Sequence, residues 1–313
     1  MKSRHASLLV ALLAVGACKK SQPDAPAVAP VAPVTKLGSA DPWSKPAAKL
    51  DPLPRPLFWT VEKDGKTTYL FGTMHMGVDP ETRVPKLVWA KLDAAPTFAM
   101  ETDLSDASKV DFFRQDGSTL HKELGDPYWK KLETAIGAEL AKQLDGMKPM
   151  VVVALLSTRG LPETPPMDGV LSGRAINEHK PMVYLERAET QTALLDKWLD
   201  ARSLKETLDD LAGGEQRSKE MLDAYIAGDD TKILAINDAE RDEYKRHGHS
   251  EAEYDQQMDE LLFKRNASWI APIEKLHAAG GGFIAVGAMH LIGKRSVLDL
   301  LQQKGYKVTR LTP

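Results

Sequence analysis

The chain lacks the features of several common protein classes. It holds one cysteine, Cys18, in 313 residues, so no disulfide can form within the chain. Its formal charge is −3 at pH 7, whereas a nucleic-acid-binding surface is basic, so no nucleic-acid partner is expected. Beyond the N-terminus, no apolar run is long enough to cross a bilayer. The sequence also contains no G-x-S-x-G, H-E-x-x-H or P-loop motif, which argues against the enzymes that depend on them.

The N-terminus has the pattern of a targeting segment. Lys2 and Arg4 are basic, and residues 7–15 form an apolar stretch that is short for a membrane span. The small residues Gly16 and Ala17 directly precede Cys18. This arrangement resembles the bacterial lipoprotein box and predicts a signal peptide at 1–17 with lipidation of Cys18. The alternative is an ordinary secretory signal with an incidental cysteine. Cleavage would remove two positive charges, Lys2 and Arg4, and take the formal charge from −3 to −5.

The residues after Cys18 predict a tether followed by one folded domain. Nine of the twenty prolines fall between residues 19 and 56, and such a stretch cannot bury a core. We therefore assign 18–56 to a lipidated cysteine with a Pro/Ala-rich linker, and 57–313 to the domain. The residue after the cysteine is Lys19, not the aspartate that signals inner-membrane retention. The prediction is a protein of the bacterial cell envelope, attached by lipid to the outer membrane in preference to the inner one.

The domain has the pattern of an α/β fold. Asp64-Gly65 is a turn signal between two apolar runs and predicts a hairpin. Strand and helix patterns then alternate, which favours parallel pairing. We expect a central, mixed, largely parallel sheet with flanking helices, and a charged helical cap inserted at about 195–279. The expected strands are 57–62, 67–71, 97–100, 182–185, 283–286 and 306–311, and the expected helices include 84–94, 170–179 and 295–304.

Two short stretches share one pattern. Gly72 lies three residues before His75, and Gly287 lies three residues before His290, and an apolar run precedes each glycine. A glycine at such a point allows a sharp turn or a close approach of a ligand. A single G-x-x-H is common, and a histidine at a strand end is often only hydrogen-bonded. Two matching copies, near the two ends of the domain, favour one shared site.

Two carboxylates complete the candidate site. Glu101 and Glu186 follow the third and fourth expected strands, and ligands of open α/β sheets bind beyond the carboxyl ends of the strands. Imidazoles and carboxylates are usual ligands of divalent Zn, Mn, Fe and Co. A bound ion of this kind lowers the pKa of its water to about 7, and a free carboxylate can act as general base. The sequence thus predicts a site for one of these ions at the sheet edge.

Arg265 and Asn266 are further candidates. They lie at the margins of the apolar face of a helix expected at 261–278. A partly buried arginine needs a carboxylate or a substrate oxygen, and the alternative is an arginine that reaches solvent at the rim. The other histidines look less promising: 247 and 249 suit a solvated turn, and 121, 179 and 277 suit the surface.

These residues resemble the TraB/PrgY/GumN family, which includes the Wnt-inactivating TIKI metalloproteases. The resemblance covers Gly72 to His75, Glu101 and Gly287 to His290, and spans about 57–311. The other matching residues are Glu186, Gln191, Arg265 and Asn266. The resemblance implies a fold like that of erythromycin esterases and haem-binding ChaN lipoproteins, and a divalent-metal hydrolase, with Mn²⁺ or Co²⁺ in the animal members. It does not name a substrate.

The leading hypothesis is a lipid-anchored, metal-dependent hydrolase that acts on a peptide or protein. His75, His290 and Glu101 would hold the ion, and Glu101, Glu186 and Arg265 would carry catalysis. The alternative is a non-catalytic envelope protein that sequesters a peptide signal, haem or iron. A third reading makes both histidines structural parts of an envelope scaffold.

Overall fold

The computed structural model describes residues 51–103 and 111–313. The expected signal peptide, Cys18 and most of the expected linker lie outside these ranges. Residues 51–56, assigned above to the linker, already join the domain, because Leu53 is buried and its N–H donates to the Arg83 carbonyl oxygen at 2.8 Å. Within residues 51–103 and 111–313, no helix combines the length and the hydrophobicity of a membrane span.

The fold is α/β, as predicted, with one six-stranded mixed sheet in the order β4-β3-β5-β2-β1-β6. Three of the five strand pairs are parallel, namely β4 with β3, β3 with β5, and β5 with β2. The strands are β1 (Phe58–Lys63), β2 (Lys66–Thr73), β3 (Phe98–Met100), β4 (Met182–Tyr184), β5 (Phe283–Gly287) and β6 (Lys307–Arg310).

The hairpin predicted at Asp64-Gly65 is present. Lys63 pairs with Lys66 across a two-residue turn, and Asp64 and Gly65 have φ values of 51° and 71°. A turn with positive φ at both central residues matches the right-handed twist of the strands, and Asp-Gly is among the sequences that adopt it most readily. β1 and β2 therefore form the antiparallel side of the sheet next to β6.

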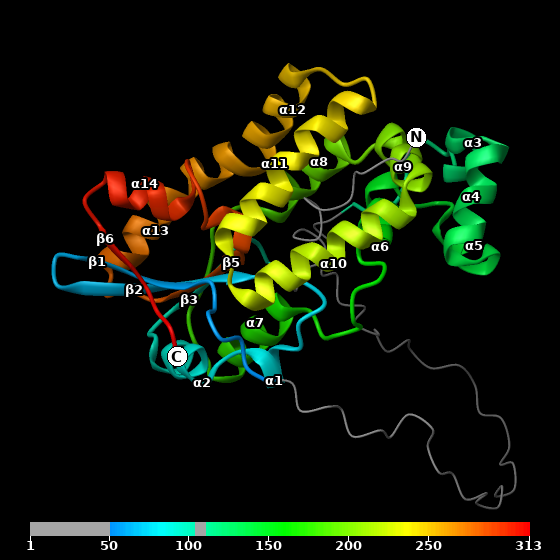
Figure 1. Cartoon of the computed structure of the whole chain (residues 1–313). Coiled ribbons are helices and arrows are strands. Elements are labelled where there is room, and N and C mark those ends of the chain that lie inside the picture. The colour runs from blue at the N-terminus through cyan, green and yellow to red at the C-terminus, as the bar shows by residue number, and fades with distance from the viewer. Residues whose placement is uncertain (1–50, 104–110) are drawn as a thin grey trace, which may run out of the picture.

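Helices cover both faces of the sheet (Figure 1). α13 and α14 lie above the strands in this view, and α1, α2 and α7 lie below them. The helices of this part are α1 (Pro80–Arg83), α2 (Lys86–Ala94), α7 (Met167–Asn177), α13 (Lys264–Ala278), the 3₁₀ turn η4 (Ala288–His290) and α14 (Val297–Gln303). α13 packs Trp269, Ile273 and Leu276 into the main core around the sheet, so it is a flanking helix and not part of a cap.

A second, helical part extends from one end of the sheet (Figure 1). Its own core holds Leu120, Trp129, Leu132, Val153 and Leu204. Its helices are α3 (Leu120–Leu124), α4 (Asp126–Ile136), α5 (Ala138–Leu144), α6 (Pro149–Ser157), α8 (Ala188–Trp198) and α9 (Ala201–Asp209). α10 (Leu211–Ala227) and α11 (Asp230–Arg246) place Leu222, Tyr225 and Ile233 in the main core around the sheet. α12 (Glu251–Met258) and the π-helical turn η3 (Asp259–Phe263) contribute Tyr254, Met258 and Leu262 to a small third cluster. The sequence predicted helices at 195–279, and α3 to α6, from the β3–β4 connection, add a contribution that it did not single out.

Candidate functional site

The strand register brings the predicted residues to one edge of the sheet. In the parallel pairs, Thr73 lies beside Gly287, and Met100 lies beside Ala285 and Tyr184. These residues lie at or near the carboxyl ends of their strands, so the residues that follow leave the sheet on the same side. His75, Glu101, Glu186 and His290 are the side chains that emerge there. Arg265 and Asn266 approach from the first turn of α13, and Gln191 comes from α8.

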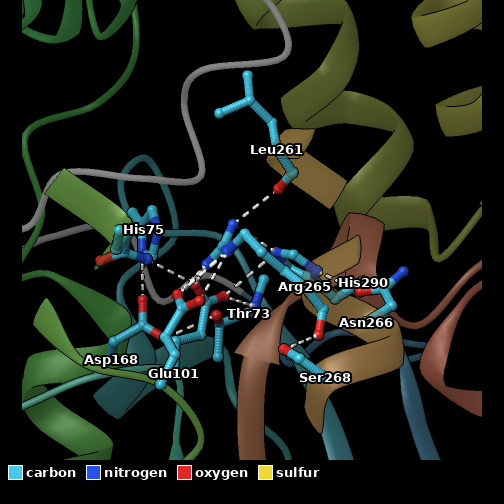
Figure 2. A network of polar contacts seen from close by, with 12 residues as sticks. Thr73, His75, Glu101, Asp168, Leu261, Arg265, Asn266, Ser268 and His290 are labelled. Carbon is cyan, nitrogen blue, oxygen red and sulfur yellow. Dashed lines mark hydrogen bonds and ion pairs between the residues drawn. The ribbon is translucent and has the colours of Figure 1, made fainter. Parts of the chain in front are cut away.

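Arg265 lies at the centre of this group (Figure 2). Its Nη2 donates to Glu101 Oε2 at 2.7 Å and to Glu186 Oε1 at 2.6 Å, and its Nε donates to Glu186 at 3.1 Å. Its Nη1 donates to the Leu261 carbonyl oxygen at 2.9 Å, and its guanidinium lies 4.9 Å from the centroid of the Trp269 ring. The side chain is only 4% exposed, so it is a buried ion-paired arginine and not one that reaches solvent.

Glu101 is held in its charged form. Its Oε1 accepts the Gly287 N–H at 2.8 Å, and its Oε2 accepts from Gln191 Nε2 at 2.9 Å as well as from Arg265. Burial by itself would raise the pKa of Glu101, but His290, the Arg265 guanidinium and the Gly287 N–H outweigh burial and hold the pKa at about 2. The carboxylate that follows β3 is therefore ionised throughout the physiological range.

The pKa of Glu186 is shifted in the opposite direction to that of Glu101. Its backbone N–H donates to the Glu101 carbonyl oxygen at 2.9 Å, so the two glutamates lie side by side. Burial raises the pKa of Glu186 and the Glu101 charge raises it further, while Arg265 lowers it, and the net pKa is raised. Two neighbouring carboxyl groups with pKa values pushed apart can take different acid–base roles.

His290 is a neutral imidazole. Its Nδ1 lies 2.6 Å from Asn266 Oδ1, and its Nε2 lies 3.3 Å from Arg265 Nη1. The amide of Asn266 is oriented by its Nδ2, which donates to the Arg295 carbonyl oxygen at 2.9 Å. The acceptor at Asn266 and the donor at Arg265 assign the ring proton to Nδ1. Burial lowers the pKa of His290 to about 3 against the pull of Glu101.

His75 is oriented by a carboxylate that the sequence analysis did not identify. Its Nδ1 bonds Asp168 Oδ2, and Asp168 Oδ1 accepts from the Thr73 hydroxyl at 2.7 Å. Burial alone would lower the pKa of His75, but the Asp168 carboxylate outweighs it and the pKa is raised. The Nε2 of His75 is buried and has no hydrogen-bond partner within the ranges that the structure describes. Among the imidazoles and carboxylates discussed so far, it is the one nitrogen or oxygen without such a partner in those ranges.

The glycines and Tyr225 shape the backbone around the histidines. A Cβ on Gly72 would lie 3.1 Å from both Ala288 Cα and Leu57 Cβ, so the two strand ends approach too closely for a side chain. The Tyr225 hydroxyl donates to the Gly72 carbonyl oxygen at 2.7 Å. Tyr225 and Asp168 were missed because their partners lie far away in the sequence. Nothing in the local sequence around Asp168 distinguishes its carboxylate from that of a surface acid.

The other histidines lie elsewhere. His277, expected at the surface, is buried. Both ring nitrogens are satisfied there, because Nδ1 accepts from the Thr68 hydroxyl at 2.8 Å and Nε2 donates to the Lys63 carbonyl oxygen at 3.0 Å. His249 lies against the Tyr244 ring, with 3.9 Å between ring centroids, and its Nε2 lies 3.0 Å from Glu206 Oε1. These contacts tie helices together and bring neither histidine to the sheet edge.

The donor set suits a divalent ion in kind and in orientation. A histidine that binds metal commonly uses one nitrogen for the ion and gives the other to a carboxylate or amide oxygen, which is how Asp168 holds His75 and Asn266 holds His290. The distances between the donor side chains are too long for a ligand set. Residues 51–103 and 111–313 contain no group of three His, Cys, Asp or Glu side chains close enough to hold an ion. Glu101 Oε1 lies 3.7 Å from His290 Nε2, and Arg265 contacts both residues.

Comparisons with known proteins give one match. Neither the curated proteins nor the solved structures contain a significant relative. A family model, in contrast, matches residues 57–310, a range that includes every residue at the sheet edge described above. The chain belongs to the TraB/PrgY/gumN family.

Proposed function

We propose that the protein is a divalent-metal-dependent hydrolase that cleaves a peptide or protein substrate. The observation that carries the proposal is the Nε2 of His75, a buried ligand atom without a partner in the described ranges, on a ring fixed by Asp168. A buried imidazole nitrogen left unpaired is costly unless something binds it. Glu101 and His290 lie at the same sheet edge, and together these three residues would hold the ion.

The ion would supply a water of lowered pKa and polarise the carbonyl of the scissile bond. Asp168 and Asn266 each bond the Nδ1 of their histidine, which would leave Nε2 as the ligand atom of both rings. Glu186 is the remaining carboxylate, and its raised pKa suits a group that accepts a proton and returns it. Arg265 is bonded to Glu186 through its Nε and its Nη2. Nη hydrogens that leave Glu101 and His290 would become donors to a developing oxyanion.

With these residues, hydrolysis would proceed in two steps. Water oxygen adds to the carbonyl carbon while Glu186 takes the water proton, and the negative charge on the carbonyl oxygen is met by Arg265. The C–N bond breaks when Glu186 returns the proton to the leaving amine. The products are a carboxylic acid and an amine, and no oxidant or second substrate is needed.

We further propose that Cys18 carries the lipid anchor and that the Pro/Ala-rich linker holds the domain away from the outer membrane. Replacement of Cys18 by alanine should move the protein from the membrane fraction to the soluble fraction. The same variant should lose incorporation of labelled fatty acid. If the variant remains membrane-bound, the anchor lies elsewhere.

The enzymatic proposal is tested on protein purified without chelator. We expect about one divalent ion per chain in the wild type, and cleavage within a peptide library. His75→Ala and His290→Ala should lose the ion and the cleavage together, whereas His121→Ala, a change at a surface histidine outside the site, should keep both. Wild-type protein with no bound ion and unchanged cleavage in both site variants would sink the proposal. Stoichiometric peptide binding without turnover would favour the non-catalytic alternative.

A further inference from the structure

Arg265 is a buried cation in contact with residues assigned to the ion. Its Nη2 contacts Glu101 Oε2 and its Nη1 contacts His290 Nε2, and these are two of the three groups assigned to the ion. The guanidinium also lies between Glu101 and Glu186, so one positive charge serves two buried carboxylates. Burial of two such carboxylates without a cation is strongly unfavourable, so the site needs a positive charge at all times.

A second cation cannot enter without a change at Arg265. The lone pair of His290 Nε2 points to Arg265 Nη1, and it cannot bind an ion and accept that hydrogen bond at once. A divalent ion next to the guanidinium would also meet like-charge repulsion in a buried setting.

We propose that Arg265 is a displaceable internal cation that neutralises the site in the ion-free protein and competes with the divalent ion for Glu101 and His290. The inference rests on the proposed function, because it concerns the same ion. When the ion binds, Arg265 releases Glu101 and His290 and keeps Glu186 through its Nε. The released Nη groups are then the donors available to the substrate carbonyl oxygen.

The helical segment directly before Arg265 contains a π-helical turn. The π-helical turn η3 ends directly before α13, which begins one residue before Arg265. Single π-helical turns within α-helices occur frequently at functional sites. Arg265 Nη1 also donates to the Leu261 carbonyl oxygen within this turn, so the side chain and the turn hold each other in the ion-free arrangement. Glu260 of the same turn accepts from Trp198 Nε1 at 2.9 Å, which links it to α8.

The test is calorimetric titration of Mn²⁺ into the mature protein. Arg265→Gln removes the internal cation, and we expect it to bind Mn²⁺ at least tenfold more tightly than the wild type. Arg265→Lys keeps the charge with fewer donors and should fall between the two. Arg174→Gln removes an exposed arginine that forms a similar two-pronged pair with Asp93 away from the site, and should bind as the wild type does.

The outcomes separate this inference from the proposed function. Binding to the wild type that is equal to or tighter than binding to Arg265→Gln overturns the inference alone. No binding to any variant overturns the proposed metal site as well. Should Arg265→Gln fold only when Mn²⁺ is present, thermal melting gives the second measurement. Mn²⁺ should raise the melting temperature of Arg265→Gln by more than that of the wild type, and equal shifts contradict the competition.

Discussion

Replacement of Glu101 by glutamine removes the most strongly ionised group of the site. Its pKa is held at about 2, against an ordinary value of 4.5. A pKa difference of this size corresponds to about 3 kcal/mol of folding free energy at neutral pH, at about 1.4 kcal/mol for each tenfold change in proton affinity. Glu101 is only 6% exposed, so solvent screens little of this contribution. We expect Glu101→Gln to lower the free energy of unfolding at pH 7 by about 3 kcal/mol.

The pH dependence of the folding stability tests the same prediction independently. A carboxyl group with a lowered pKa stabilises the fold fully above its unfolded value of about 4.5 and loses this contribution as the pH falls toward 2. Between pH 7 and pH 3, the wild type should lose about 2 kcal/mol through Glu101 alone. Glu101→Gln lacks the titrating group, so its stability should fall by correspondingly less over the same interval.

Urea denaturation followed by tryptophan fluorescence at pH 7 and pH 3 measures both effects. Glu62→Gln is the control, because Glu62 forms an exposed pair with Lys307 and such pairs contribute about 0–1 kcal/mol. The reasoning is refuted if Glu101→Gln changes the stability at pH 7 by less than the control does. It is also refuted if wild type and Glu101→Gln lose the same stability between pH 7 and pH 3.

Three further substitutions test the supports of the site. Asp168→Asn should lower the pKa of His75, measured by NMR titration, and weaken Mn²⁺ binding about 10- to 100-fold, because the carboxylate orients and polarises the ring. Tyr225→Phe should cost about 1–3 kcal/mol in urea denaturation, because the buried Gly72 carbonyl oxygen loses its donor. Gly72→Ala should cost about 1–3 kcal/mol in the same assay, because the new Cβ would crowd the backbone of Ala288. No loss of stability in Tyr225→Phe or Gly72→Ala, or unchanged metal binding in Asp168→Asn, would contradict the assigned role.

The sequence predicted the sheet and the edge at which the candidate residues gather because each strand has its own local signal. Each strand is a short apolar run, and the Asp64-Gly65 turn has its own residue signature. Once the strands were placed, the rule that parallel strands end at one edge brought together His75, Glu101, Glu186 and His290. The pattern of the helix at 261–278 then put Arg265 at the margin of an apolar face, near the carboxylates that it binds.

The sequence did not predict the contacts made over long distances. Asp168 lies 93 residues from His75, and nothing in the local pattern of 165–170 distinguishes its carboxylate from a surface acid. His277 was assigned to the surface because it stands apart from the other candidate residues in the sequence, whereas the hairpin end at Lys63 and Thr68 folds over it. The contribution of α3 to α6 was missed for a related reason, because their core forms mainly against helices that come later in the chain.

The central claim is that the histidines at the ends of β2 and β5 share one divalent ion with Glu101. Its most direct test is a crystal structure of the mature protein soaked in Mn²⁺, with anomalous scattering collected at the manganese edge. The account predicts one anomalous peak bonded to Nε2 of His75, Nε2 of His290 and the Glu101 carboxylate, with Arg265 withdrawn from Glu101. A site without an anomalous peak, with Arg265 still bound to Glu101 and His290, would contradict it.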